Sequence, residues 1–281
     1  MDVKQRMMTH PHPSVRVCAL LALGGWPASD PQVAESRALI VKVPPVRDIL
    51  AAQYPAGHWM HPGLGISPRY RATLWQVLFL AQFGVGLIPE VVRAIEVMRR
   101  DNLDDAGAFH LRRGTPGRSL ALTGAFLWAV ARFGLQDVAD WSVSWRWVRE
   151  EIDSDRVATA DAVWSIRAAA AWQRDLCPGH TAIWEQIDWP DLAPAAPQTA
   201  ALTFPVALEP DLLTLMAACV EAGVPALIPP LAVDWLADRR LPSGDWPLEH
   251  VPGRLWCAVG EIGQPNPWVT VRALAVLDAL S

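Results

Sequence analysis

The chain is poor in charge, in cysteine and in long apolar runs, and each scarcity excludes a class of protein. Only 19% of its 281 residues are charged and 52% are hydrophobic, which is too apolar for a disordered chain. Its cysteines are far apart and form no CxxC pair, so the sequence predicts neither a disulfide framework nor a zinc knuckle. With 24 Lys+Arg against 29 Asp+Glu and no Lys/Arg run, it lacks the basic face that nucleic acid requires.

No apolar run reaches the roughly 18 residues that a membrane-spanning helix needs. The nearest, 212–233, is interrupted by Glu221 and three prolines. The apolar stretch 17–23 lacks a small-residue cleavage site, which argues against a signal peptide. We therefore expect a single cytoplasmic domain over residues 1–281, a composition that remains compatible with peripheral contact with a membrane.

Tryptophan, in contrast, is abundant, and the sequence repeats itself. There are 15 Trp against two Tyr, which indicates an aromatic interior or a repeat that reuses Trp structurally. Residues 73–84 are similar to 123–134, and residues 87–100 are similar to 227–240. Such self-similarity predicts tandem units of roughly 40–50 residues, the length of helix-pair repeats.

Each unit has the pattern of two helices. In the second unit, apolar residues recur at helical spacing from Leu74 to Ala81, and Gly84 marks the end of the helix. A second helix begins at Pro89 and ends at Arg100. No segment alternates with a period of two, so we expect an all-α fold without a sheet. The expected units are 14–59, 67–109, 118–155, 158–193 and 210–246, followed by a last helix at 267–280.

The loop after the first unit carries a family signature. Gln53, Gly57 and Trp59 form the pattern Gln-x-x-x-Gly-x-Trp, which resembles the repeat of squalene and hopene cyclases and, more widely, loops of the prenyltransferase superfamily. Residues 240–246 repeat it with Arg for Gln, and 103–109 repeat it more loosely. The resemblance implies an α/α toroid, a double ring of about six helix pairs, whose central cavity opens at the N-termini of the inner helices. It also implies that the Gln and Trp of the motif tie neighbouring outer helices together, so we expect Trp59 and Trp246 to be at least largely buried between such helices.

The same resemblance implies a terpenoid cyclase-like protein that binds or cyclises an apolar isoprenoid. Such cyclases protonate an alkene with an Asp-x-Asp-Asp acid. The nearest motif here, Asn102-Leu-Asp104-Asp105, has Asn first and lies in a repeat loop. Asp161, at the start of the fourth inner helix, is therefore our preferred catalytic acid, with Asp104 and Asp105 as the other candidates. A solvated turn and a helix cap are the alternative interpretations.

Aromatic and basic residues supply the candidate ligand site. An aromatic wall suits an isoprenoid and stabilises a carbocation, so we expect a mostly apolar cavity with its polar groups at a mouth near Arg69 and Asp161. The alternative is that each Trp fills space between the layers and the Arg side chains are solvated. The predicted substrate-binding residues are Arg69, Tyr70, Arg71, Trp75, Trp128, Trp164 and Trp268.

Other functions remain open at this point. A zinc-dependent prenyltransferase-like enzyme would need Asp, Cys and His ligands, and Cys177 and His180 have ligand-like spacing, with Cys257 or His250 to complete a site. We expect a turn at 177–180, with no metal and no cofactor. A toroid that lost the acid would be a non-catalytic binding or scaffold protein, and a carbohydrate-active helical barrel would need paired carboxylates at the cavity mouth.

Overall fold

The computed structural model describes residues 2–63, 65–110, 117–153, 157–173, 183–184, 187–190 and 200–281. The protein is mostly helical, which confirms the all-α prediction. Within these ranges, no helix has both the length and the apolar character required to cross a membrane.

Units 67–109, 118–155 and 210–246 each hold two helices, as predicted. Unit 14–59 holds three instead of two, and in unit 158–193 the described residues give bounds for α9 alone. The sequence pattern also did not predict α1 or a short antiparallel pairing of β1 (Phe109–His110) with β2 (Arg118–Ser119), which corrects the expectation of no sheet. A 3-10 turn, η2, spans Pro225–Leu227. The helices are α1 (Val3–Met8), α2 (Pro13–Ala22), α3 (Pro31–Ile40), α4 (Val46–Ala51), α5 (Thr73–Gln82), α6 (Pro89–Asn102), α7 (Leu120–Arg132), α8 (Ser142–Ile152), α9 (Thr159–Trp172), α11 (Leu212–Glu221), α12 (Pro230–Asp238) and α13 (Pro267–Asp278).

Proline and glycine mark many of the helix ends. A proline lies in the first turn of helices α2, α3, α6, α12 and α13. The N–H groups of a first turn have no acceptor within the helix, so a residue without an N–H costs no hydrogen bond there. At the start of α13, the Asn266 side chain also accepts hydrogen bonds from the backbone N–H groups of Trp268 and Val269. Gly84 and Gly134 follow the ends of α5 and α7 at φ +76° and +75°, a conformation that favours glycine.

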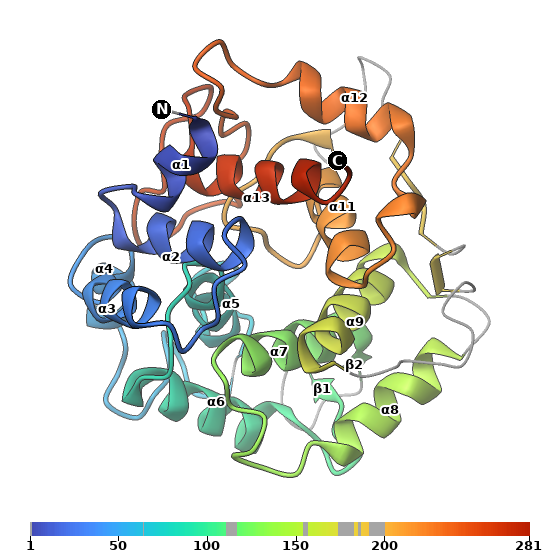
Figure 1. Cartoon of the computed structure of the whole chain (residues 1–281). Coiled ribbons are helices and arrows are strands. Elements are labelled where there is room, and N and C mark those ends of the chain that lie inside the picture. Colours follow the sequence, from blue (N-terminus) through green and yellow to red (C-terminus); the bar gives the residue numbers. More distant parts are fainter. Residues whose placement is uncertain are drawn as a thin grey trace.

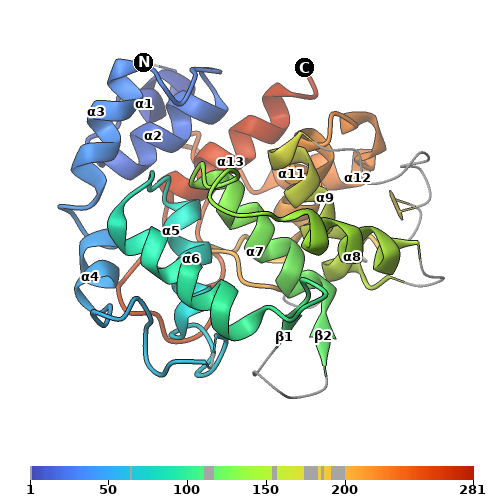
Figure 2. The same ribbon diagram turned by 90° about the horizontal axis from the view of Figure 1, so that it is seen from below.

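Six helices contact one another in a closed order. Helix α5 contacts α7, and the contacts continue through α9, α11 and α13 to α2. The Ser14 hydroxyl of α2 donates 2.7 Å to the backbone oxygen of Phe83 at the end of α5, which completes the order. In Figure 1 these helices lie nearer the centre, whereas α3, α4, α6, α8 and α12 lie at the rim. Seen from below, α6 and α8 lie in front of the helices that they contact, α5 and α7 (Figure 2).

The three Gly-x-aromatic loops share one hydrogen-bonding pattern. In each, the backbone N–H of the aromatic residue donates to a threonine hydroxyl on an inner helix. These pairs are Trp59 to Thr73 at 3.1 Å, Phe109 to Thr123 at 2.9 Å and Trp246 to Thr270 at 3.0 Å. A loop closed by the same backbone bond precedes each aromatic residue: Tyr54 N–H to His58, Asp104 N–H to Ala108 and Leu241 N–H to Asp245. The repeat seen in the sequence is thus a structural repeat as well.

Trp59 and Trp246 are fully buried, as predicted. Their indole N–H groups donate 2.7 Å to the backbone oxygens of Ile49 and Leu236, in the last turns of α4 and α12. Carbonyls in a last helical turn have no partner four residues on, and the Trp246 indole supplies a donor for Leu236. The Ile49 oxygen accepts from the Ala52 N–H at 3.2 Å as well as from the Trp59 indole. The Gln53 side chain donates 2.9 Å to the backbone oxygen of Glu90 on α6. The loop therefore ties α4 to α6, two neighbouring outer helices.

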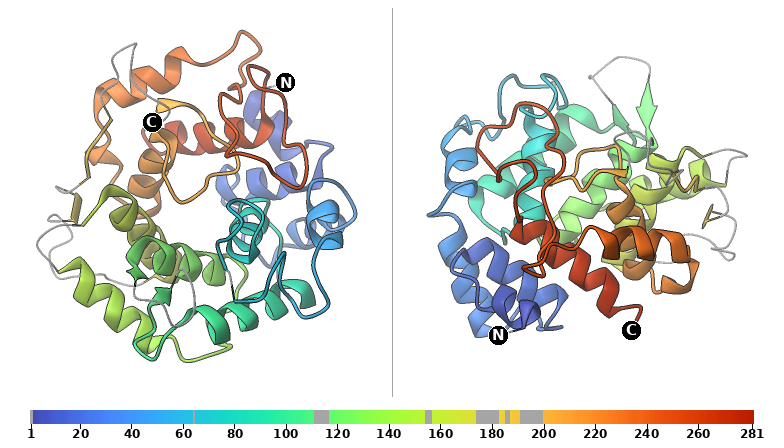
Figure 3. Two further views of the ribbon diagram at one scale, coloured as in Figure 1. Left: turned by 180° about the vertical axis from the view of Figure 1, so that it is seen from behind. Right: turned by 90° about the horizontal axis from the view of Figure 1, so that it is seen from above.

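The segment 200–210 crosses the middle of the molecule (Figure 3). The backbone of Val206 forms two hydrogen bonds with the Gln82 side chain of α5. The Val206 N–H donates 2.7 Å to the side-chain oxygen, and the side-chain amide donates 2.8 Å to the Val206 backbone oxygen. The Leu208 backbone oxygen accepts from the Trp164 indole of α9 at 2.7 Å. This segment occupies space between inner helices that the repeat pattern alone would leave empty.

Candidate functional site

A cavity of about 340 Å³ lies between the inner helices. Its wall comes from the C-terminal halves of α2, α5, α7 and α11, one residue of α9, a face of α13 and the crossing segment. Most of its lining is apolar, as predicted. The lining residues are Cys18, Leu21, Ala22, Ala81, Gln82, Trp128, Arg132, Arg167, Phe204, Val206, Ala217, Val220, Glu221, Trp268, Val271, Arg272, Ala275 and Val276.

Aromatic side chains form one side of this cavity. The Trp268 indole stacks on the Phe204 ring with centroids 5.3 Å apart and an interplanar angle of 5°. The ring of Phe83 meets Trp268 edge-on at 5.5 Å. The Trp268 N–H donates 2.9 Å to the Ser14 hydroxyl, so its polar atom is satisfied and its ring is held in place.

Charged residues also line the cavity, which corrects the expectation that polar groups lie only near Arg69 and Asp161. Arg167 forms a two-point ion pair with Glu221, at 2.8 and 2.9 Å, and its guanidinium lies 4.7 Å from the Trp128 ring centroid. Arg272 donates 2.9 Å to the backbone oxygen of Thr203 and lies 3.3 Å from Asp211. Burial lowers the pKa of Arg272 from its ordinary value.

Asp161 does not share this cavity with Trp128 and Trp268. It lies in the first turn of α9 and lines a separate depression of about 290 Å³. Its carboxyl accepts 2.6 Å from the backbone N–H of Ala121, which joins the start of α9 to the start of α7. Burial raises the pKa of Asp161, although backbone hydrogen bonds oppose the shift. The expectation of one cavity at the inner-helix N-termini is therefore wrong, because the 340 Å³ cavity follows the C-terminal halves of most of these helices.

Asp104 holds its own loop together. Its carboxylate accepts 2.9 Å from the Ala108 N–H and 2.8 Å from Arg118, and lies 2.9 Å from His110 Nε2. Burial opposes ionisation, but these hydrogen bonds hold the pKa of Asp104 below its ordinary value. An ionised carboxylate has no proton to give an alkene. Asp105 is exposed on the same loop, and both line an outer depression of about 780 Å³ rather than the central cavity.

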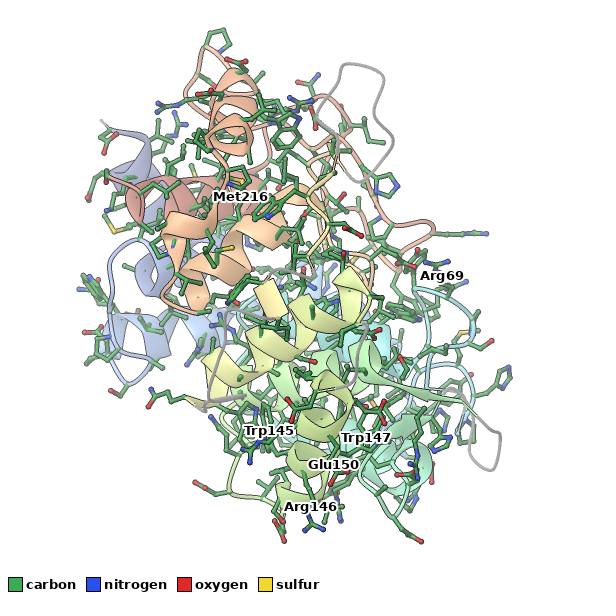
Figure 4. The ribbon with its side chains drawn as sticks, turned by 90° about the vertical axis from the view of Figure 1, so that its right-hand side faces the viewer. Arg69, Trp145, Arg146, Trp147, Glu150 and Met216 are labelled. Carbon is green, nitrogen blue, oxygen red and sulfur yellow. The ribbon has the colours of Figure 1, made fainter. Side chains whose placement is uncertain are left out.

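The predicted basic mouth lies apart from the 340 Å³ cavity. Arg69 is exposed and pairs with Glu209 (Figure 4). The Arg71 guanidinium lies 3.8 Å from the ring centroid of Trp256. Tyr70, between them, packs against Trp75 with centroids 5.3 Å apart. None of these residues lines the cavity.

The predicted tryptophans divide into two groups. Trp128 and Trp268 line the cavity, whereas Trp75 and Trp164 are buried behind it. The indole of Trp75 donates 2.8 Å to the Ile66 backbone oxygen, and that of Trp164 donates to the crossing segment. Trp75 and Trp164 therefore fill space between packed elements, which was the alternative to lining the cavity.

The suggested zinc ligands Cys177 and His180 lie outside the described residues. Burial raises the pKa of the Cys257 thiol to about 12, so it is not a thiolate near neutrality. In the part of the chain that the structure describes, no group of three His, Cys, Asp or Glu side chains is placed to hold a metal ion.

Sequence reasoning missed Arg167, Glu221 and Arg272. A signal existed, because each interrupts an otherwise apolar helical segment: Arg167 stands among alanines, and Glu221 follows the apolar face of α11. A lone charge in a buried helix predicts a partner on another element.

Comparison with known proteins adds no assignment: the chain matches no family model, and no curated protein matches it.

Proposed function

We propose that the protein is an α/α toroid similar in architecture to the terpenoid cyclase and prenyltransferase superfamily. The closed order of contacts through α2, α5, α7, α9, α11 and α13 supports this proposal. The outer helices α3, α6, α8 and α12 contact the inner helices α2, α5, α7 and α11, and the repeated Gly-x-aromatic loops join the layers.

We propose further that this ring binds a small apolar molecule in its 340 Å³ cavity without cyclising it. The observation that carries the proposal is an apolar wall, with Trp128, Phe204 and Trp268, that offers no proton donor of the cyclase type. Of the described residues that line the cavity, Glu221 alone carries a carboxyl, and Arg167 binds both of its oxygens. Both oxygens of this carboxyl are therefore engaged by the guanidinium of Arg167, and neither is presented to a ligand in the cavity.

Cyclisation is the second candidate, and Asp161 favours it. Its raised pKa keeps a proton on this carboxyl to a higher pH than usual, as an acid catalyst requires. The indole of Trp147 lines the same depression. Against this candidate, Asp161 already accepts the Ala121 N–H and faces Arg118 and Glu151 across a mostly polar depression.

Two measurements separate these functions. Calorimetric titration with decanol should show binding to the wild-type protein and to Asp161→Asn. Ala275→Phe, which places a ring in the cavity, should abolish it, whereas Ala279→Phe, at the exposed end of α13, should not. Incubation with squalene, farnesyl diphosphate and geranylgeranyl diphosphate should give no cyclised product.

The opposite results decide against the binding proposal. Decanol that fails to bind, or that binds equally well to Ala275→Phe, would show that the cavity is not a ligand site. A cyclised product that is lost in Asp161→Asn and kept in Asp104→Asn would establish the second candidate instead.

A further inference from the structure

Positive charge remains at the cavity after its ion pairs are accounted for. Glu221 is bound by Arg167, and Asp211 lies against Arg272. Arg132, at the end of α7, also lines the cavity and is exposed to solvent. Within the described ranges, no carboxylate lies within ion-pair distance of Arg132. The cavity therefore has an uncompensated cation on its solvent side, although the whole chain carries a net charge of −5.

A second arginine, Arg37 on α3, is near enough to Arg132 for the two positive charges to interact. Burial, and next the positive charge of Arg132, lower the pKa of Arg37 on α3. The Nε atom of Arg37 is buried, with no hydrogen-bond partner. Cys18, near both arginines, provides no negative charge because burial raises the pKa of its thiol to about 11. An anion bound at Arg132 would offset positive charge that no side chain near it offsets.

The volume of the cavity limits the apolar part of a ligand. A water molecule occupies roughly 30 Å³ in the liquid, so a cavity of 340 Å³ holds about eleven groups of that size. A chain of roughly ten carbons fills this space, whereas most of squalene, with about three times as many carbons, would lie outside it. The Arg132 guanidinium lies 5.9 Å from the Trp128 ring, so the cation directly adjoins the apolar wall.

From this juxtaposition we propose that the cavity takes a chain of roughly ten carbons ending in an anionic head group, with Arg132 holding the head and the aromatic wall packing on the chain. This inference rests on the proposed function. A guanidinium presents parallel N–H donors that match a carboxylate or a phosphate, so either head group satisfies the site.

Titration calorimetry with four probes tests the proposal. Decanoate and decanol form one pair, and geranyl diphosphate and geraniol form the other, so each pair differs mainly in head-group charge. We expect at least one anion to bind the wild-type protein about tenfold or more tightly than its alcohol. The head group of the tighter anion, carboxylate or diphosphate, identifies the class of natural ligand.

Two variants test whether Arg132 causes the preference for the anion over its alcohol. Arg132→Gln should reduce it to about threefold or less and leave the affinity for the alcohols unchanged. Arg146→Gln is the matched control, because Arg146 is an exposed arginine on α8 (Figure 4). Melting curves of both variants should match the wild type, because both side chains are exposed and the structure shows no ion pair for either among the described residues.

Each contrary result has a distinct meaning. Equal affinity for anions and alcohols overturns the head-group inference and leaves the proposed function intact. Failure of all four probes to bind overturns both. An anion preference that survives in Arg132→Gln overturns the assignment to Arg132, and tighter binding of squalene than of decanol overturns the limit on size.

Discussion

Replacement of Trp59 or Trp246 tests the repeat loop most severely. Both side chains are fully buried, and each indole N–H satisfies a backbone oxygen at the end of an outer helix. Alanine removes the ring and leaves a cavity, which typically costs about 3–5 kcal/mol in the free energy of unfolding. Phenylalanine keeps most of the ring but removes the indole donor, which at Trp246 costs about 1–3 kcal/mol because the Leu236 oxygen loses its bond. The cost at Trp59 should be smaller, because the Ile49 oxygen keeps its bond from the Ala52 N–H.

Urea denaturation and calorimetry measure these losses. At roughly 2–4 °C per kcal/mol, Trp59→Ala should lower the melting temperature by about 6–20 °C, and Trp59→Phe by distinctly less. Tyr54→Ala is the control within the same loop. Its side chain is 53% exposed, so its loss should change the free energy of unfolding by about 0.5 kcal/mol or less. A loss for Trp59→Ala as small as that for Tyr54→Ala would refute the structural role of the motif.

Three further predictions concern other sites. A Cβ at Gly107 would lie 2.4 Å from the Ser144 backbone nitrogen, whereas one at Gly134 has nothing within 4 Å, and both glycines have positive φ. Gly134→Ala should therefore cost about 1–2 kcal/mol in unfolding and Gly107→Ala distinctly more; equal losses would contradict the contact. Because the folded-state pKa of Asp104 is lowered, its carboxylate stabilises the fold above about pH 4 and loses this effect as pH falls through the folded-state value. Asp104→Asn should therefore flatten the acid side of the stability profile, and an unchanged slope would contradict the pairing. With a pKa of about 11, Cys18 should react with maleimide at about pH 8 much more slowly in the native protein than after unfolding, and equal rates would contradict the raised pKa.

The helical framework was predictable because its signals are local. Apolar spacing, first-turn prolines and terminal glycines are read over a dozen residues, and the helices of units 67–109, 118–155 and 210–246 follow them. The burial of Trp59 and Trp246 followed from repetition of the loop. Helix α1 was missed because six residues are too few to show a helical period.

The cavity could not be located in the same way, because it depends on contacts between distant parts of the chain. The segment 200–210 has no periodic pattern, yet it crosses the interior and provides Phe204 to the wall. Arg167 meets Glu221 across 54 positions of sequence, and Arg272 meets Asp211 across 61. The sequence did not indicate which carboxyl groups would be ionised. Asp104 is kept ionised by hydrogen bonds with His110 and Arg118, and the sequence alone does not show that these side chains reach it.

A crystal structure of the protein grown with decanol tests the ligand site most directly. We predict electron density for the alkyl chain inside the inner helices, between the Trp128 ring and the stacked rings of Phe204 and Trp268. Ala275→Phe crystals grown in the same way should lack it. Density for decanol only on the outer surface, or a wild-type cavity closed by Trp128 and Trp268 against each other, would contradict the proposal that this ring binds an apolar ligand.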